Sequence, residues 1–568
     1  MNVILGMSAA TGTGIGRAFV LPEVQKRIIP KTPISAEDVD TGWNRFQTAC
    51  SVIGTQISSH LNTLSKDSLQ RVIFETYQLM LSDPVFIKEV KDCYEQELFN
   101  IEHILEKKVF EYADRLRNSG NEYLAERSKD IEDVFGQVLD ILLDYHPFNI
   151  EEVPDGSVIV GKAMSSSDTI ILSKRKIAGL ALTEGGTTSH MAILARSFGI
   201  PAVVGLDNVT EQVKQNDIVI VDGELGEIIV SPDADTIQSY RKRMEDEKLQ
   251  RIELAKLRDT EARTKDGTRF CLYANIGTVE EAKIALDEGA DGIGLFRTEF
   301  LFMNAIRQLN ESGGAYSNSV GEETQFEAYK SVLEIMGNRP VTIRTLDAGG
   351  DKLVDVKDIP QMHEANPLMG LRAIRLSLYY PHVLRTQLRA LYRASVYGDL
   401  RILLPLITDI SQVETIKGIA KGVQLQLKED NIPFREVPIG VMIETAAAAV
   451  TSDCLAKTSD FFSLGTNDLT QYTLGVDREN PAVAPIYNEF NLAVIRLIQF
   501  TIHNARHRDV PVSVCGEMAG KPESVMILSG MGIRNLSMSP KQIPLIKQTL
   551  SRFTIKELEN IANRNIIQ

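Results

Sequence analysis

Apolar residues recur every three or four positions through residues 35–145, a stretch with a single proline, Pro84. Such steps place the apolar side chains on one stripe of a helix. Ser35, followed three residues later by Asp38, resembles a capping box at the start of the first helix. The stripe of this first predicted helix consists of Val39, Trp43, Phe46, Cys50, Ile53, Ile57, Leu61 and Leu64.

The same spacing continues beyond the first helix, in segments 66–82, 84–118 and 121–145. We therefore predict an inserted four-helix bundle covering residues 22–146. By itself this pattern indicates only that helices pack on helices.

Residues 1–21 and 147–231 show a different sequence pattern: short β-rich runs are interrupted by glycine and proline, and there is one helix candidate, SHMAILARSFG. This pattern predicts a compact α/β domain into which the bundle is inserted. Residues 232–263 are dense in charges of both signs at helical spacing, which is typical of an exposed linker helix.

From residue 264 to residue 568, strand-like runs alternate with helical stretches. About 300 residues of repeated β-then-α predict a (β/α)₈ TIM barrel. Seven runs are clear, and GLRAIR at 370–375 could mark the eighth strand. The seven are FCLYANIG, GIGLFRTEF, VTIRTLD, LRILLPLI, IGVMIE, FFSLGTND and VSVCGE.

Polar side chains cluster where these predicted strands end. In such barrels the active site forms at the C-terminal ends of the strands, so we expect these side chains to meet at one mouth. Strand ends are also polar simply because they leave the core, which explains one or two of these residues. It explains poorly the combination of arginines, carboxylates and a thiol: Arg297, Arg344, Glu444, Asn467, Asp468 and Cys515.

Several arginines at one mouth indicate a ligand with several negative charges, because a guanidinium binds phosphate or carboxylate with two parallel hydrogen bonds. The candidates are Arg297, Arg344, Arg372 and Arg478. Glu444 and Asp468 offer the hard oxygen ligands that suit Mg²⁺. They could equally be ion-pair partners of the arginines, and spacing does not separate the two interpretations.

Two further residues carry possible chemistry. Cys515 follows an apolar run, and an isolated cysteine is more often a buried core residue than a reactive one. His190, in GGTTSHMAILAR, follows a glycine turn and is predicted to lie in the first turn of a helix. Free backbone N–H groups and the helix dipole favour an anion there, so His190 is a candidate phosphoryl carrier.

Composition narrows the function further. The formal net charge of −15 argues against general binding to nucleic acid or to an anionic membrane surface. Five scattered cysteines without CxxC spacing indicate free thiols in a reducing compartment. The N-terminal sequence lacks the basic region of a signal peptide, and no run approaches the ~20 apolar residues of a membrane span. We therefore expect a cytoplasmic protein.

Together, these segments resemble the family of phosphoenolpyruvate-protein phosphotransferases, Enzyme I of the bacterial sugar phosphotransferase system. GGTTSHMAILAR is similar to the family's phosphohistidine signature, and NEYLAERSKDIEDV to its helical-domain signature. The barrel motifs follow in the family's order along nearly the whole chain. They are GIGLFRTEFLFM, RTLDAGGDK, GLRAIR, GVMIET, FFSLGTNDLTQYTLGVDR and CGEMAG.

The resemblance implies a role for each matching position. His190 would be phosphorylated by phosphoenolpyruvate, with the Thr169 hydroxyl in contact with it. Cys515 would protonate the departing enolate to give pyruvate, while Glu444 and Asp468 would hold Mg²⁺. The residues that would bind phosphoenolpyruvate are Arg297, Arg344, Arg372, Asn467 and Arg478.

The resemblance also implies partners and movement. The phosphoryl group would pass to a histidine of the phosphocarrier protein HPr bound on the helical bundle. Because donor and acceptor lie on different domains, the histidine domain would swing as a rigid body, with 232–263 and its flanks as hinges. Similar enzymes dimerise through the barrel, so a homodimer is expected.

The departures from the family pattern include a long segment at 304–324 and a serine-rich segment at 165–167. Two alternatives stay open. One is a regulatory paralogue that senses phosphoenolpyruvate without turning it over. The other is an enzyme related to pyruvate phosphate dikinase and phosphoenolpyruvate synthase, although the chain has no P-loop and no room for the nucleotide domain ahead of the histidine domain.

Overall fold

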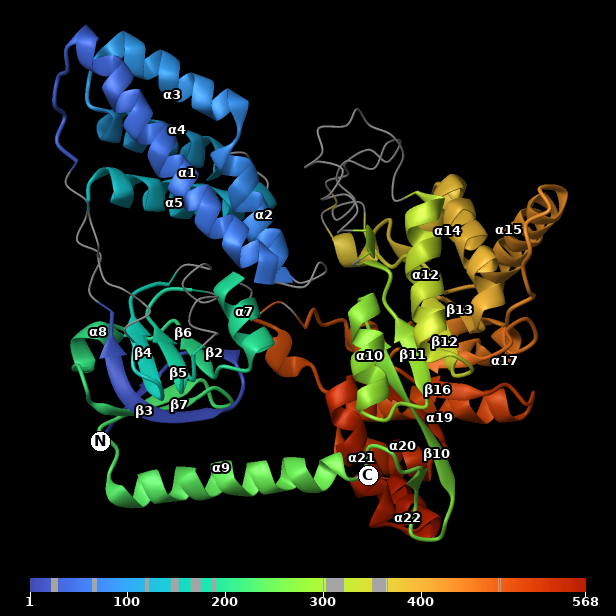
Figure 1. The fold of residues 1–568 in the computed structure, drawn as a ribbon. Coiled ribbons are helices and arrows are strands. Elements are labelled where there is room, and N and C mark those ends of the chain that lie inside the picture. The colour runs from blue at the N-terminus through green and yellow to red at the C-terminus, as the bar shows by residue number, and fades with distance from the viewer. Residues whose placement is uncertain are drawn as a thin grey trace. The chain divides into compact units, whose positions relative to one another are not determined.

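The structure, a computed structural model, describes the chain to residue 567, apart from twelve stretches. It divides into two compact units, residues 1–248 and 249–568, which are described separately (Figure 1). The stretches outside the description are 22–28, 64–68, 118–121, 145–152, 165–174, 186–189, 300, 303–320, 350–363, 365, 479 and 481.

The first unit contains the predicted helical bundle. Its described helices are α1 (Val39–Thr63), α2 (Leu69–Leu81), α3 (Pro84–Glu97), α4 (Ile101–Arg117) and α5 (Glu122–Leu142). The described part of the predicted apolar stripe lies in the bundle core, where Phe46, Ile53 and Ile57 are buried, and Leu64 lies outside the described residues. A short 3₁₀ turn precedes α1. There the backbone N–H and the hydroxyl of Ser35 donate to Asp38 at 3.4 and 2.7 Å, which confirms the predicted cap.

Segment 84–118 is two helices rather than a continuous one. Leu98 adopts a left-handed conformation with φ of 52°, and its N–H donates to the carbonyl of Tyr94 at 3.2 Å, which ends α3. The chain forms a bridge with Pro33 at Phe99 before α4 begins. A non-glycine residue at this helix end carries no sequence signal, whereas the apolar spacing continues on both sides of it.

The rest of the first unit is the predicted α/β domain, an eight-stranded sheet ordered β1-β8-β7-β3-β4-β5-β6-β2. Strands β3 and β4 are parallel neighbours, with Arg17 opposite Ser157, so the bundle is inserted between two adjacent strands. The described helices of this domain are α7 (His190–Phe198) and α8 (Val209–Gln212). The strands are β1 (Asn2–Leu5), β2 (Met7–Ala10), β3 (Thr13–Val20), β4 (Ser157–Gly161), β5 (Gly179–Leu182), β6 (Ala202–Val204), β7 (Ile218–Asp222) and β8 (Glu227–Val230).

Helix α9 (Ala234–Ala255) occupies most of the predicted linker segment. Its apolar residues Leu249 and Ile252 are about half exposed, as expected for an isolated helix. Near the middle of this helix, Arg243 donates to the fully buried Asp222 of β7 at 2.8 Å.

The second unit is the predicted (β/α)₈ barrel. Each of its eight parallel strands pairs with the next, and β10 closes the ring by pairing with both β11 and β17. A short strand, β9 (Ala262–Arg263), adds antiparallel to β10. The barrel strands are β10 (Arg269–Ile276), β11 (Gly292–Phe296), β12 (Pro340–Arg344), β13 (Asp399–Leu404), β14 (Ile439–Ile443), β15 (Phe462–Leu464), β16 (Val512–Val514) and β17 (Asn535–Met538).

Helices alternate with these strands and cover the barrel (Figure 1). The described ones are α10 (Val279–Asp287), α12 (Glu322–Met336), α13 (Ala373–Tyr379), α14 (Pro381–Ala394), α15 (Ile410–Glu429), α16 (Ala446–Val450), α17 (Ser452–Leu455), α18 (Thr466–Leu474), α19 (Leu492–Arg506), α20 (Pro522–Gly530), α21 (Ile543–Ser551) and α22 (Ile555–Ile567).

The assignment of GLRAIR as the eighth strand is wrong. Arg372 makes a single bridge with Gly349, and the chain then enters helix α13 at Ala373. The eighth strand is β17, whose sequence NLSM is too short and too polar at its start to stand out as a buried run.

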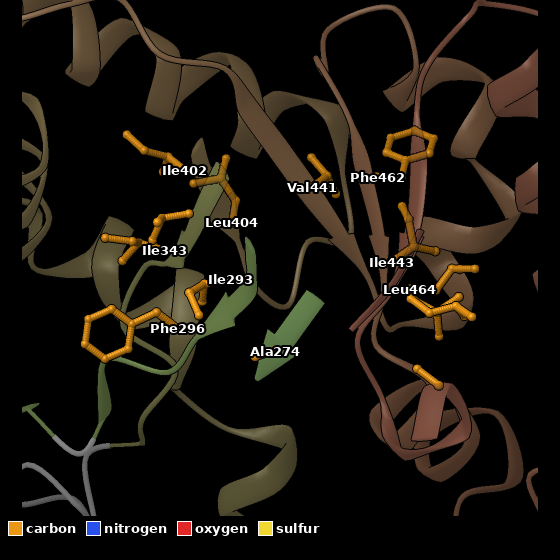
Figure 2. Packing of buried hydrophobic residues seen from close by; sticks show 14 of the residues in the cluster. Ala274, Ile293, Phe296, Ile343, Ile402, Leu404, Val441, Ile443, Phe462 and Leu464 are labelled. Carbon is orange, nitrogen blue, oxygen red and sulfur yellow. The ribbon is translucent and has the colours of Figure 1, made fainter. Parts of the chain in front are cut away.

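Side chains of the barrel strands alternate between two environments. Figure 2 shows outward residues such as Ile343, Ile402 and Val441 in the cluster that packs against the helices. The residues between them point into the barrel, because successive side chains of a strand face opposite sides. The inward apolar cluster consists of Leu295, Leu403, Met442, Phe461 and Cys515.

Among the described residues, no helix has the length and apolarity that crossing a membrane requires.

Candidate functional site

Strand alternation brings four of the predicted site residues to the inside of the barrel. Arg297 is two residues beyond the inward Leu295, and Glu444 is two residues beyond the inward Met442. Arg344 is the last residue of β12, and Cys515 directly follows β16. All four therefore lie at the C-terminal ends of their strands, where the sequence predicted the mouth of a site.

The remaining barrel candidates lie on helices and loops at the same end. Asn467 and Asp468 are in the first turn of α18, and the Asn467 side-chain oxygen accepts the N–H of Glu517 at 2.8 Å. Arg478 follows α18, where its backbone N–H donates to Gln471 at 3.1 Å. Arg372 is the residue directly before α13.

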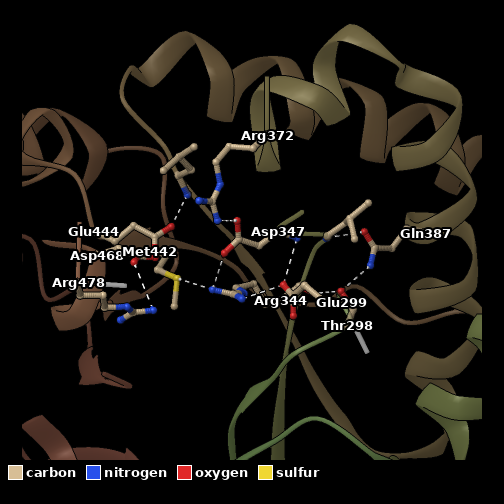
Figure 3. Close-up of polar contacts among 12 residues, drawn as sticks. Thr298, Glu299, Arg344, Asp347, Arg372, Gln387, Met442, Glu444, Asp468 and Arg478 are labelled. Atoms are coloured by element: carbon tan, nitrogen blue, oxygen red, sulfur yellow. Dashed lines mark hydrogen bonds and ion pairs between the residues drawn. The ribbon is translucent and has the colours of Figure 1, made fainter. Parts of the chain in front are cut away.

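Two carboxylates that the sequence analysis did not single out neutralise the central arginines. Arg344 pairs with Glu299 at 2.8 Å and with Asp347 at 2.9 Å, and Arg372 pairs with the other oxygen of Asp347 at 2.9 Å. Figure 3 shows Asp347 between the two guanidinium groups. Glu299 lies in the motif FRTEF and Asp347 in the motif RTLD. The sequence could have indicated them, because several buried arginines need nearby carboxylates to balance their charge.

This pairing keeps both arginines charged. Burial alone would lower the pKa of Arg344, but the carboxylates of Glu299 and Asp347 raise it above its usual range. Burial also opposes the charge of Arg372, and Asp347 again raises the pKa. The Nε atoms of both side chains are buried without an acceptor among the described residues. Each guanidinium therefore keeps one buried N–H donor that no described residue satisfies.

Glu444 is 1% exposed and is held by the main chain. One of its oxygens accepts the backbone N–H of Leu406 at 2.5 Å, and Leu406 adopts a left-handed conformation with φ of 52° to direct this N–H. Burial, with the charges of Asp468 and Asp347, raises the pKa of Glu444 well above its usual value.

A cation near Glu444 and Asp468 would relieve this unfavourable burial of carboxylates. Two carboxylates fit Mg²⁺, which keeps water and substrate oxygens as its other ligands. In the described part of the chain, no group of three or more potential metal-binding side chains gathers. The alternative that Glu444 and Asp468 serve as ion-pair partners of the arginines has little support. Asp468 is 3.9 Å from Arg478, and Arg344 and Arg372 pair with other carboxylates.

Cys515 is 2% exposed and packs in the inward apolar cluster. Ser463 donates a hydrogen bond to its sulfur at 3.1 Å, and Asn275 donates to its carbonyl at 2.9 Å. Burial raises the pKa of this thiol to about 11, although Ser463 and Arg344 act in the opposite direction. The thiol therefore holds its proton at neutral pH, so it can act as an acid as well as pack.

The predicted phosphoryl carrier lies in the first unit. Helix α7 begins at His190, which confirms that this residue occupies the first helical turn. Thr169, which the resemblance places in contact with His190, lies outside the described residues.

Comparison with known proteins covers both units. Three family models match: PEP-utilising enzyme, N-terminal (residues 5–127), mobile domain (153–226) and PEP-binding domain (251–555). A phosphoenolpyruvate-protein phosphotransferase of Priestia megaterium is 37% identical, covering 98% of this chain and 95% of that one. The enzyme of the same name from Staphylococcus aureus is 36% identical, covering 100% and 97%, and that of Bacillus sp. (strain S) is 38% identical, covering 99% and 95%.

Proposed function

Because the chain belongs to the phosphoenolpyruvate-protein phosphotransferase family, and is therefore a phosphotransferase, we propose that His190 accepts the phosphoryl group of phosphoenolpyruvate and passes it to a histidine of the phosphocarrier protein HPr. This would be the first step of the sugar phosphotransferase system. The observation that carries the proposal is the barrel mouth, where arginines, a buried carboxylate and a protonated thiol meet.

Phosphoenolpyruvate carries both a phosphate and a carboxylate, which matches a site with several arginines. We propose that Arg344 and Arg372 bind its oxygens, with Arg297, Arg478 and Asn467 completing the binding set. Because Glu299 and Asp347 already offset two of the positive charges, the arginines can stand close together before the substrate arrives.

In the transfer itself, the neutral imidazole of His190 attacks phosphorus. A phosphorus–nitrogen bond forms as the bond from phosphorus to the enol oxygen breaks, and the enzyme's part is mainly positioning and charge stabilisation. The Cys515 thiol gives its proton to the methylene carbon of the enolate, which yields pyruvate, and the thiolate regains a proton from solvent.

PEP-utilising enzymes are in general metal dependent, and we propose that the ion here is Mg²⁺, held by Glu444 and Asp468. When bound, Mg²⁺ supplies positive charge beside the phosphate and enolate oxygens. We also propose that Thr169 contacts His190, that HPr docks on residues 22–146, and that the cytoplasmic enzyme dimerises through the barrel.

The proposal is tested by incubating the protein with ³²P-labelled phosphoenolpyruvate and Mg²⁺ and then adding HPr. We expect acid-labile labelling that is absent from His190→Ala and that moves to HPr in the unmodified protein. Labelling that survives His190→Ala would refute the assignment of the acceptor. Binding of phosphoenolpyruvate without any labelling would instead favour a regulatory sensor.

A further inference from the structure

A buried polar network lies at the C-terminal end of β12, where side chains of α12 and α14 meet the loops that follow β11 and β12. Its centre is Gln387 of α14, which is 1% exposed. The Gln387 carbonyl oxygen accepts the backbone N–H of Leu346 at 3.0 Å. Its amide nitrogen donates to the hydroxyls of Thr298 at 3.4 Å and Tyr329 at 3.1 Å. All four groups are within 1% of complete burial.

The direction of every hydrogen bond in this network is fixed. A backbone N–H can only donate, so the carbonyl oxygen of Gln387 must face Leu346 and its NH₂ must face the two hydroxyls. The Thr298 hydroxyl, which accepts from Gln387, then donates to the backbone carbonyl of Arg344 at 3.0 Å. The Tyr329 hydroxyl donates away from the strand, to Gln325 at 3.1 Å.

One carboxamide therefore holds the main chain on both sides of Thr345. It binds Leu346 directly and Arg344 through Thr298, and Figure 3 shows Gln387, Thr298 and Arg344 joined in this way. The segment held in this way carries Arg344 and leads directly into Asp347, the carboxylate shared with Arg372.

We propose that Gln387 is a positioning residue for phosphoenolpyruvate binding, which sets the place of Arg344 and Asp347 by holding the peptide groups of residues 344 and 346. This rests on the proposed role of Arg344 in binding phosphoenolpyruvate. Gln387 itself is buried and acts through the arginine. A small displacement of a binding group by a distant substitution can weaken a site strongly.

The test uses calorimetric binding of phosphoenolpyruvate with Mg²⁺, in the full chain carrying His190→Ala so that no phosphoryl transfer occurs. Gln387→Met keeps the length of the side chain and removes all three hydrogen bonds. We expect the Kd to rise about tenfold or more. Thr298→Val removes only the link to Arg344 and should raise the Kd by a smaller factor.

Tyr329→Phe is the matched control, because it removes a buried hydroxyl from the arm that leads away from the strand. Its melting temperature should fall by about as much as that of Gln387→Met, while its Kd for phosphoenolpyruvate stays within about twofold of that of the His190→Ala protein. Because Gln387 and Thr298 act on the same carbonyl, their effects on Kd should be less than additive in the double variant.

The outcomes separate the two proposals. If the His190→Ala protein binds no phosphoenolpyruvate, both the proposed function and the role of Gln387 fall. If it binds and Gln387→Met binds equally well, only the role of Gln387 is refuted. Should Gln387→Met not fold, Thr298→Val decides. A Kd at least threefold higher than that of Tyr329→Phe supports the role, and any smaller rise refutes it.

Discussion

Asp347 offers the most direct test of the electrostatic balance in the barrel mouth. Asp347→Asn keeps the size of the side chain and removes the charge shared by Arg344 and Arg372, each 2.9 Å from one of its oxygens. Asp347 is 8% exposed, so water cannot readily replace it. We therefore expect the substitution to destabilise the barrel unit.

The size of the effect follows from what remains. Removing one partner of a buried ion pair costs about 3–5 kcal/mol, because the other charge stays buried. Arg344 keeps Glu299 at 2.8 Å, which favours the lower end of this range. About 3 kcal/mol corresponds to a fall of roughly 4–5 °C in the melting temperature of a unit of this size.

Scanning calorimetry of the ligand-free protein would measure this change in the transition of the barrel. Asp430→Asn is a suitable control, because Asp430 pairs with Arg389 at 2.6 Å but its side chain is 52% exposed. Exposed pairs contribute about 0–1 kcal/mol. If Asp347→Asn were no more destabilising than Asp430→Asn, Asp347 would not be what balances the two arginines.

Two further predictions concern the carboxylate and the thiol of the mouth. Burial and the charge of Asp468 raise the pKa of Glu444 well above the usual 4.5, so ionising this carboxyl group destabilises the folded protein. The metal-free protein should therefore lose stability as the pH rises from about 4.5 through the raised pKa. Glu444→Gln should remove this loss: denaturation in the presence of a chelator should show it more stable than the unmodified protein at pH 7 and equally stable near pH 4. If the free energies of unfolding of the two proteins changed with pH in parallel, the prediction would be wrong. Cys515→Ala should keep phosphoenolpyruvate binding but slow labelling by about 10²- to 10⁴-fold in rapid-quench assays, whereas lost binding would make the thiol a packing residue only.

Much of the fold follows from periodicity. Helical spacing located the bundle, and runs of apolar residues located seven of the eight barrel strands. The failures have physical causes. Leu98 ends a helix through its backbone conformation, and GLRAIR alternates like a strand although the chain turns into a helix at Ala373. Tertiary pairing, rather than local composition, makes Asn535–Met538 a strand.

The site was predictable only in part, and for a similar reason. Arg344 and Glu444 stood out because a charged residue at the end of an apolar run contrasts with its neighbours. Glu299 and Asp347 stand as close to strand ends, but a carboxylate there is equally typical of any exposed loop. Gln387 lies within a regular helix, and only the fold brings it against the strand that it holds.

The contact between Leu406 and Glu444 has a consequence for how the site tolerates sequence change. The donor is a main-chain N–H, so every residue except proline would supply it, and no side chain at position 406 is required for it. The left-handed conformation there costs about 1–2 kcal/mol for a residue with a Cβ. Glycine would relieve that strain but would leave the buried Leu406 side chain's space empty. Packing and backbone strain therefore limit what position 406 can hold, whereas the hydrogen bond to Glu444 depends only on the main chain.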